Sequence, residues 1–164
     1  MGNRPISLSD ARLLIVVHHS AANDVWSDPE TLKAERQRRG EGYNFIIDDD
    51  LSGPNDKKFE AVQDAPDDEI SNGTYGINWQ AWNICIDGNF EESKPTEDEI
   101  YALIQVIAAK AKKWGWTKKD VWRIITHQYA GQHISTEYYG TACPGRNLIA
   151  QIQKIRLKVQ GYLP

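Results

Sequence analysis

The feature that most constrains the fold of this chain is an uninterrupted aliphatic block near its N-terminus. Residues 13–17 are all Leu, Ile or Val, without the polar residue at every second position that marks a half-exposed strand. Such a run is typical of a strand that is covered on both faces, as in a parallel sheet. We therefore expect a buried strand over residues 11–17, with His18 and His19 at its carboxyl end.

Three further segments have the composition of strands. Residues 43–47, 83–87 and 121–126 are short and apolar, with polar or turn-forming residues close by, and the last of them is followed by His127. Residues 55–80 lack periodicity and are rich in Asp, Asn, Gly and Pro, which predicts a long surface loop of the kind that often contributes to a binding site.

Helices are expected between these strands. Ser27 is a suitable cap for a charged helix over 28–40, Thr96 and Glu99 have the spacing of a capping box, and Pro144 is a typical first residue of a final helix. Strands that alternate with helices predict an α/β fold, with a central mixed sheet of five or six strands and helices on both sides. The apolar positions that indicate the last two helices are Ile100, Leu103, Ile104, Ile107, Ala108 and Ala111, then Leu148, Ile149, Ile152, Ile155 and Val159.

Size and charge exclude several classes of protein. A chain of 164 residues can bury a core without disulfides, and we expect one domain over 1–164 with its core at about 11–160. A net charge of -4 argues against a nucleic-acid partner, because phosphate binding needs a basic surface. No run approaches the roughly 18 apolar residues of a membrane helix, and residues 1–10 lack the apolar core of a signal peptide. We expect a protein made in the cytoplasm that uses another route of release.

Three side chains form a set suited to one metal ion. His18 and His127 each follow a predicted strand, and Cys143 precedes a predicted helix, whose start favours the thiolate. Imidazole and thiolate are the ligands that zinc prefers, and three protein ligands leave the fourth position for water, as in catalytic sites. His133 is an alternative to His127; we favour His127 because the end of a strand holds a ligand more firmly than a loop does.

Five short motifs carry a resemblance to a known family. In chain order they are VVHHSA at 16–21, GYNFII at 42–47, NICIDGNF at 83–90, ITH at 125–127 and TACPG at 141–145. In this order they resemble the N-acetylmuramoyl-L-alanine amidases of type 2, a family that includes phage amidase lysozymes and peptidoglycan recognition proteins. The resemblance runs from about Leu13 to the final helix.

This resemblance implies a zinc-dependent hydrolase with one Zn²⁺ per chain, in a cleft at the edge of the sheet. The substrate would be bacterial peptidoglycan, cut between the lactyl group of N-acetylmuramic acid and the L-alanine of the stem peptide. The family's zinc ligands carry over to His18, His127 and Cys143, and its tyrosine beside the metal matches Tyr43. Thr141 stands two residues before the cysteine. The hydroxyls of Tyr43 and Thr141 are expected to stabilise the oxyanion, although tyrosine is also common in strands.

Several other side chains have two interpretations. Asn44, Tyr75 and Trp79 are candidate substrate contacts; Trp79 and its neighbour Trp82 either stack on sugar rings or fill the core. Residues 73–75 read Gly-Thr-Tyr where many family members have Gly-Ala-His, so a histidine that contacts substrate is replaced here. Cys85, between two isoleucines, is expected to be a small buried residue without a bridge to Cys143, and His19 to point away from the metal.

The setting and two rival classes stay open at this level. We expect a monomeric, bacteriolytic phage or prophage endolysin, but a recycling enzyme, an autolysin or a delivered effector would have a similar sequence. One rival is a peptidoglycan-binding protein of the same fold without catalysis, and Cys143 argues against it because non-catalytic relatives commonly lack that ligand. The other rival is a zinc-free module with incidental histidines. No carboxylate lies in a matching motif, so the group that transfers the proton to the leaving amine is not assigned.

Overall fold

The computed structural model describes residues 14–21, 33, 34, 37, 42–48, 60–66, 70–134 and 140–164. In this part of the chain, one sheet has the strand order β3-β2-β4-β1-β5. Strands β2, β4, β1 and β5 run parallel to one another and β3 runs antiparallel to β2, so the sheet is mixed, as predicted. The strands are β1 (Leu14–His19), β2 (Phe45–Asp48), β3 (Glu60–Gln63), β4 (Ala81–Ile86) and β5 (Ile124–Thr126).

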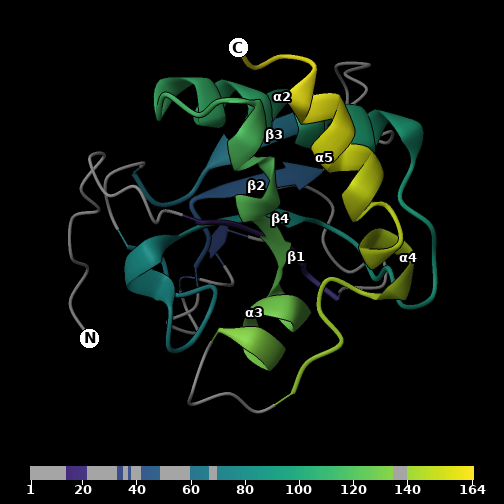
Figure 1. Cartoon of the computed structure of the whole chain (residues 1–164). Helices are drawn as coiled ribbons and strands as arrows, with labels where there is room; N and C mark the ends of the chain where they lie inside the picture. The colour runs from purple at the N-terminus through teal and green to yellow at the C-terminus, as the bar shows by residue number, and fades with distance from the viewer. Residues whose placement is uncertain are drawn as a thin grey trace.

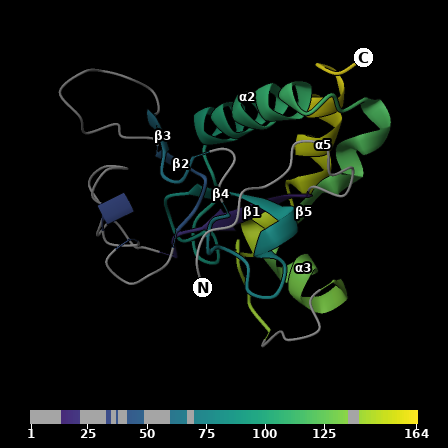
Figure 2. The ribbon, with the colours of Figure 1, turned by 90° about the vertical axis from the view of Figure 1, so that its left-hand side faces the viewer.

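Helices cover both faces of this sheet. Figures 1 and 2 show α2 and α3 on opposite sides of the strands, with α5 on the side of α2. Ile15 and Val17 of β1 pack into the core beneath α2 and α5, whereas Leu14 and Val16 pack with Ala130 of α3. The helices are η1 (Asn78–Gln80), α2 (Glu97–Lys113), η2 (Lys118–Arg123), α3 (His127–His133), α4 (Arg146–Ile149) and α5 (Ile152–Gln160).

The first four residues of β1 are aliphatic because the strand is buried on both faces. All six residues of β1 are buried, and β1 lies between β4 and β5. The capping box at the start of α2 is also confirmed: Thr96 accepts from the backbone of Glu99, whose side chain accepts from the backbone of Thr96. Residues 11–13 and most of the helix expected over 28–40 lie outside the described residues, although positions 33, 34 and 37 are helical.

Three predicted boundaries were wrong. Only residues 124–126 of the fourth predicted strand are in β5, because Thr117 and Asp120 form a second capping box that opens η2. The predicted loop over 55–80 contains β3, an outer strand with only two apolar residues, and η1. The final helix is divided into α4 and α5, and α4 begins only at Arg146.

Smaller shifts affect two other strands: β2 begins at Phe45 rather than Tyr43, and β4 spans residues 81–86. Among the described residues, no helix is both long enough and apolar enough to span a membrane.

Candidate metal centre

Strand pairing brings the two predicted histidine ligands together. Val17 of β1 is aligned with Thr126 of β5, so the next residues, His18 within β1 and His127 just after β5, lie at the same end of the sheet. Thr126 also caps α3, since its hydroxyl accepts from the backbone N–H of Tyr129 at 3.1 Å. The chain therefore changes from strand to helix at His127. The ring centroids of His18 and His127 are 4.7 Å apart.

Cys143 completes the group. Its sulfur lies 3.7 Å from Nδ1 of His18. One ligand atom from each of His18, His127 and Cys143 can be chosen so that all three lie within 4.8 Å of one another. Two imidazoles and a thiol are the donor set that zinc prefers, and a tetrahedral ion held by three of them keeps one position for water. The side chains present therefore fit a catalytic zinc ion.

The position of this group corrects the expectation of a cleft at the sheet edge. His18 lies on β1, an inner strand, and alternation along the strand places its side chain on the same face as Leu14 and Val16. That is the face opposite α2 and α5 (Figure 1). The ligands meet above the carboxyl ends of β1 and β5, because parallel strands present their ends on one side of the sheet.

Of the two candidate histidines on α3, the structure brings His127 to the group. His133 is at the far end of α3, where its ring packs against that of Tyr129 with centroids 4.4 Å apart. Burial lowers the pKa of His127 to about 4, with a smaller contribution from the positive charge of His19. His127 is therefore neutral at physiological pH, which is the form that binds a metal ion.

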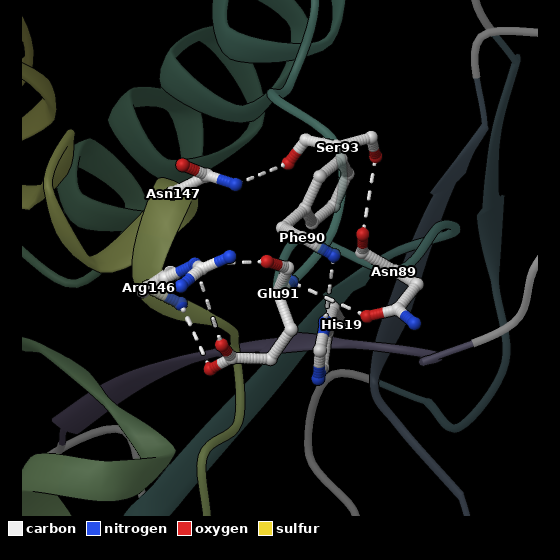
Figure 3. A network of polar contacts seen from close by, with 7 residues as sticks. All are labelled: His19, Asn89, Phe90, Glu91, Ser93, Arg146 and Asn147. Carbon is white, nitrogen blue, oxygen red and sulfur yellow. Dashed lines mark hydrogen bonds and ion pairs between the residues drawn. The ribbon is translucent and has the colours of Figure 1, made fainter.

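Cys143 is held in place by a contact between two loops. Gly145 has a φ of +90°, and a Cβ there would lie 2.4 Å from the carbonyl carbon of Phe90, so only glycine fits. The backbone N–H of Phe90 in turn donates to Nδ1 of His19 at 3.1 Å, and the two rings stack (Figure 3). His19 therefore faces away from the ligand group, as predicted, and links β1 to the segment that carries the cysteine.

The chain after Cys143 is tied to the same loop. Figure 3 shows Arg146 and Asn147 against residues 89–93: Nε of Arg146 donates to the carbonyl oxygen of Glu91 at 3.0 Å, and Nδ2 of Asn147 donates to that of Ser93 at 2.8 Å. Because α4 is short and starts downstream of Pro144, the helix dipole is not the source of thiolate stabilisation that we expected. The neighbours of the sulfur include His18 Nδ1 and, at 3.9 Å, the carbonyl oxygen of His19.

The two residues whose hydroxyls are expected to act in catalysis, Tyr43 and Thr141, both lie next to ligand residues. Tyr43 is 8% exposed, packs against Ile46 and Cys85, and has its ring centroid 5.1 Å from that of His18. The hydroxyl oxygen of Thr141 accepts a hydrogen bond from the backbone N–H of Cys143 at 3.1 Å. This bond does not use the hydroxyl proton of Thr141.

The candidate substrate contacts fall into two groups. Asn44 is fully buried, and its side chain bonds to Ser71, Asn83 and the carbonyl of Pro66, so it belongs to the interior of the fold in this structure. By contrast, Tyr75 is 59% exposed and Trp79 is 46% exposed. Both side chains are therefore accessible to a ligand that binds at the protein surface.

The structure also decides the place of Trp82 and confirms that of Cys85. Trp82, for which stacking on sugar and packing in the core were both open, is 1% exposed and lies in the core. Cys85 and Cys143 are both free, and Cys85 is buried.

Asn83 and Thr74 contact His18 but were assigned no role from the sequence. Asn83 Oδ1 lies 2.8 Å and Thr74 Oγ1 lies 3.2 Å from Nε2 of His18. A signal existed for Asn83, because it is a polar residue inside the buried segment of β4, where an amide without partners would be costly. For Thr74 the one indication was that residues 73–75 read Gly-Thr-Tyr where many family members have Gly-Ala-His.

Comparison with known proteins agrees with this geometry. Residues 9–146 match the family model of N-acetylmuramoyl-L-alanine amidase, and the chain belongs to this family. Curated protein sequences contain no significant match.

Solved structures share the fold. The amidase LysC from Clostridium intestinale is 23% identical with a TM-score of 0.67, covering 95% of this chain and 90% of its own. Apis mellifera PGRP-SA is 18% identical with a TM-score of 0.65, and the match covers 93% of this chain and 88% of PGRP-SA. A mutant of Drosophila PGRP-LB in complex with tracheal cytotoxin is 17% identical with a TM-score of 0.64, and the match covers 93% of this chain and 85% of that protein.

Replacement of His127, but not of His133, should weaken metal binding. We expect the metal-free protein to bind one Zn²⁺, and His127→Ala to weaken this binding by at least about 100-fold because a ligand is lost. His133→Ala is the matched control and should bind zinc like the unaltered protein. Competition with a chromophoric chelator measures both affinities, and equal weakening in the two variants would contradict the assignment.

The low pKa of His127 predicts a pH dependence of stability in the metal-free protein. The unfolded chain binds this proton near pH 6.5 and the folded chain only near pH 4. The unfolded state therefore holds more protons between these values, so the contribution of His127 is fully present above pH 6.5 and is lost as the pH falls towards 4. Urea unfolding across this range measures it, and His127→Gln should flatten the dependence whereas His133→Gln should not.

Proposed function

We propose that this protein is a zinc-dependent N-acetylmuramoyl-L-alanine amidase, which hydrolyses the amide bond between the lactyl group of N-acetylmuramic acid and L-alanine in peptidoglycan. The observation that carries the proposal is the convergence of His18, His127 and Cys143 in a chain of the amidase family. In this proposal the three side chains hold one Zn²⁺. When bound, zinc lowers the pKa of a coordinated water to about 7 and polarises the scissile carbonyl.

The protein's own groups have two tasks in this reaction. His127 stays neutral because it is buried, and so keeps a lone pair for the metal. Tyr43 and Thr141 lie beside the ligands, and their hydroxyls donate to the carbonyl oxygen as it gains negative charge. The substrate amide lies across the ligand group, on the face of the sheet away from α2 and α5.

Exposed aromatic residues form the proposed surface for the rest of the substrate. Thr74 contacts His18, Tyr75 directly follows Thr74, and Trp79 comes five residues after it, so both exposed rings lie on a segment that touches the ligand group. Flat apolar rings with polar edges suit the faces of sugar rings and the stem peptide. The PGRP-LB structure with tracheal cytotoxin is a related fold with a ligand bound, and we propose peptidoglycan as the partner here.

The proposed setting is the lysis of bacteria by a phage or prophage endolysin. Proteins of similar fold include a Clostridium intestinale endolysin amidase, LysCS, and the endolysin of a Thermus scotoductus bacteriophage. The second candidate is a peptidoglycan-binding protein without catalysis, since peptidoglycan recognition proteins share the fold. Cys143 favours the enzyme, because its thiol completes the metal ligand set.

Digestion of purified peptidoglycan separates these functions. The amidase should release new L-alanine amino termini, seen by mass analysis, whereas a glycosidase would produce new reducing sugar ends. Cys143→Ser should abolish both zinc binding and this release; Cys85→Ala, the other free cysteine, should retain both. Zinc binding and binding to the cell wall without any cleavage would overturn the enzyme in favour of the binding protein.

Tyr43→Phe tests the oxyanion role apart from the metal. Loss of one hydroxyl donor should lower kcat by about 100- to 1,000-fold, while KM and zinc content change little because the ring and the ligands remain. Initial rates on a soluble muropeptide, together with metal analysis, measure this. Activity close to that of the unaltered protein would remove Tyr43 from the mechanism.

A further inference from the structure

A buried polar cluster surrounds the ring nitrogen of His18 that is remote from Cys143. Nε2 of His18 lies 2.8 Å from Oδ1 of Asn83 and 3.2 Å from Oγ1 of Thr74, and Thr74 donates its proton to Asn83 Oδ1 at 2.7 Å. His18 is 1% exposed, and Asn83 and Thr74 are fully buried. Protons in this cluster are therefore placed by the protein and not by bulk water.

The orientation of the Asn83 amide is set from the backbone. The N–H of Asn83 donates to Oδ1 of Asn44 at 2.9 Å, and because a backbone N–H can only donate, the oxygen of Asn44 must face it. Nδ2 of Asn44 points the other way, to the carbonyl of Pro66 at 3.3 Å. The same oxygen of Asn44 accepts from Ser71 Oγ at 2.9 Å, which uses the only hydroxyl proton of Ser71.

Ser71 in turn determines the orientation of the Asn83 side-chain amide. Having donated to Asn44, its oxygen can only accept, and it does so from Nδ2 of Asn83 at 2.8 Å. Rotating the Asn83 amide would place its oxygen against that lone pair. This contact would be repulsive in a buried site, where an unmet polar group is costly. Oδ1 of Asn83 therefore faces His18.

An amide oxygen is an acceptor only, so the neutral ring of His18 must carry its proton on Nε2. The lone pair is then on Nδ1, which is the atom 3.7 Å from the sulfur of Cys143. We propose that Asn83, oriented through Ser71 and Asn44, is a positioning residue that holds His18 in the Nε2–H tautomer and so makes Nδ1 its metal-binding atom. This inference rests on the proposed metal centre.

Glycine at position 73 makes room for this arrangement. A Cβ on Gly73 would lie 2.6 Å from Cγ and 2.9 Å from Oδ1 of Asn83. The backbone N–H of the neighbouring Thr74 donates to Oδ1 of Asn78 at 2.6 Å, which stabilises the turn between Thr74 and η1. The Gly-Thr pair therefore provides the space for the amide and a hydroxyl beside it.

The expected consequence is tighter metal binding. A histidine ligand that donates its second N–H to an oxygen is fixed in orientation and becomes a more basic ligand, and loss of such a partner typically costs 10- to 100-fold in metal affinity. Asn83→Leu has a similar size but no acceptor. We expect it to weaken Zn²⁺ binding by about this factor.

The direct test is the tautomer of His18 in the metal-free protein. Long-range ¹H–¹⁵N spectra of labelled protein distinguish the two ring nitrogens, and we expect the Nε2–H form alone in the unaltered protein and a mixture of both forms in Asn83→Leu. Thr74→Val is the matched control: it keeps the Asn83 oxygen, so the tautomer should be retained. A residue with a merely structural role would leave the tautomer ratio unchanged.

A milder variant covers the case in which Asn83→Leu does not fold. Ser71→Ala removes one hydroxyl and frees the Asn83 amide to rotate, so the Nδ1–H form of His18 should appear. Protonation at Nδ1 in the unaltered protein, zinc bound through Nε2, or a folded Asn83→Leu or Ser71→Ala variant with an unaltered tautomer would each overturn the inference. These readouts use metal-free protein and zinc alone, so a failure to cleave peptidoglycan would leave them intact.

Discussion

The candidate site depends on the insertion of β1 between two parallel strands. Because β4 and β5 pair with both edges of β1, the peptide groups of β1 are bonded within the sheet and its side chains can all be buried. Parallel pairing also places the carboxyl ends of β1 and β5 side by side. The ligands His18 and His127 follow from this register, and no loop has to bring them together.

Adjacent histidines at the end of β1 have opposite tasks. His18 faces the ligand group and, through Nε2, the buried amide of Asn83, whereas His19 accepts from the backbone of Phe90 on the other side. The loop that contains Phe90 then meets Gly145, just after Cys143. One strand end therefore fixes both a ligand and the segment that supplies the cysteine.

Local signals predicted those parts of the fold that local interactions control. The capping box of α2 and the aliphatic pattern of β1 both read correctly, because each reflects residues close together in sequence or burial on both faces. The outer strand β3 was missed since it pairs on one side only and carries few apolar residues. The capping box at Thr117 was also overlooked, and it shortened the predicted fourth strand.

By itself, the sequence determined the type of fold, the family resemblance and the chemical identity of the metal-ligand set. Tertiary structure decided that His127 and not His133 joins that set, which face of the sheet it occupies, and that Asn83 and Thr74 contact His18. The physical reason is that these contacts join distant segments, as in the 65 positions between His18 and Asn83. Strand register and loop packing create such contacts, and neither is encoded in the periodicity of a single segment.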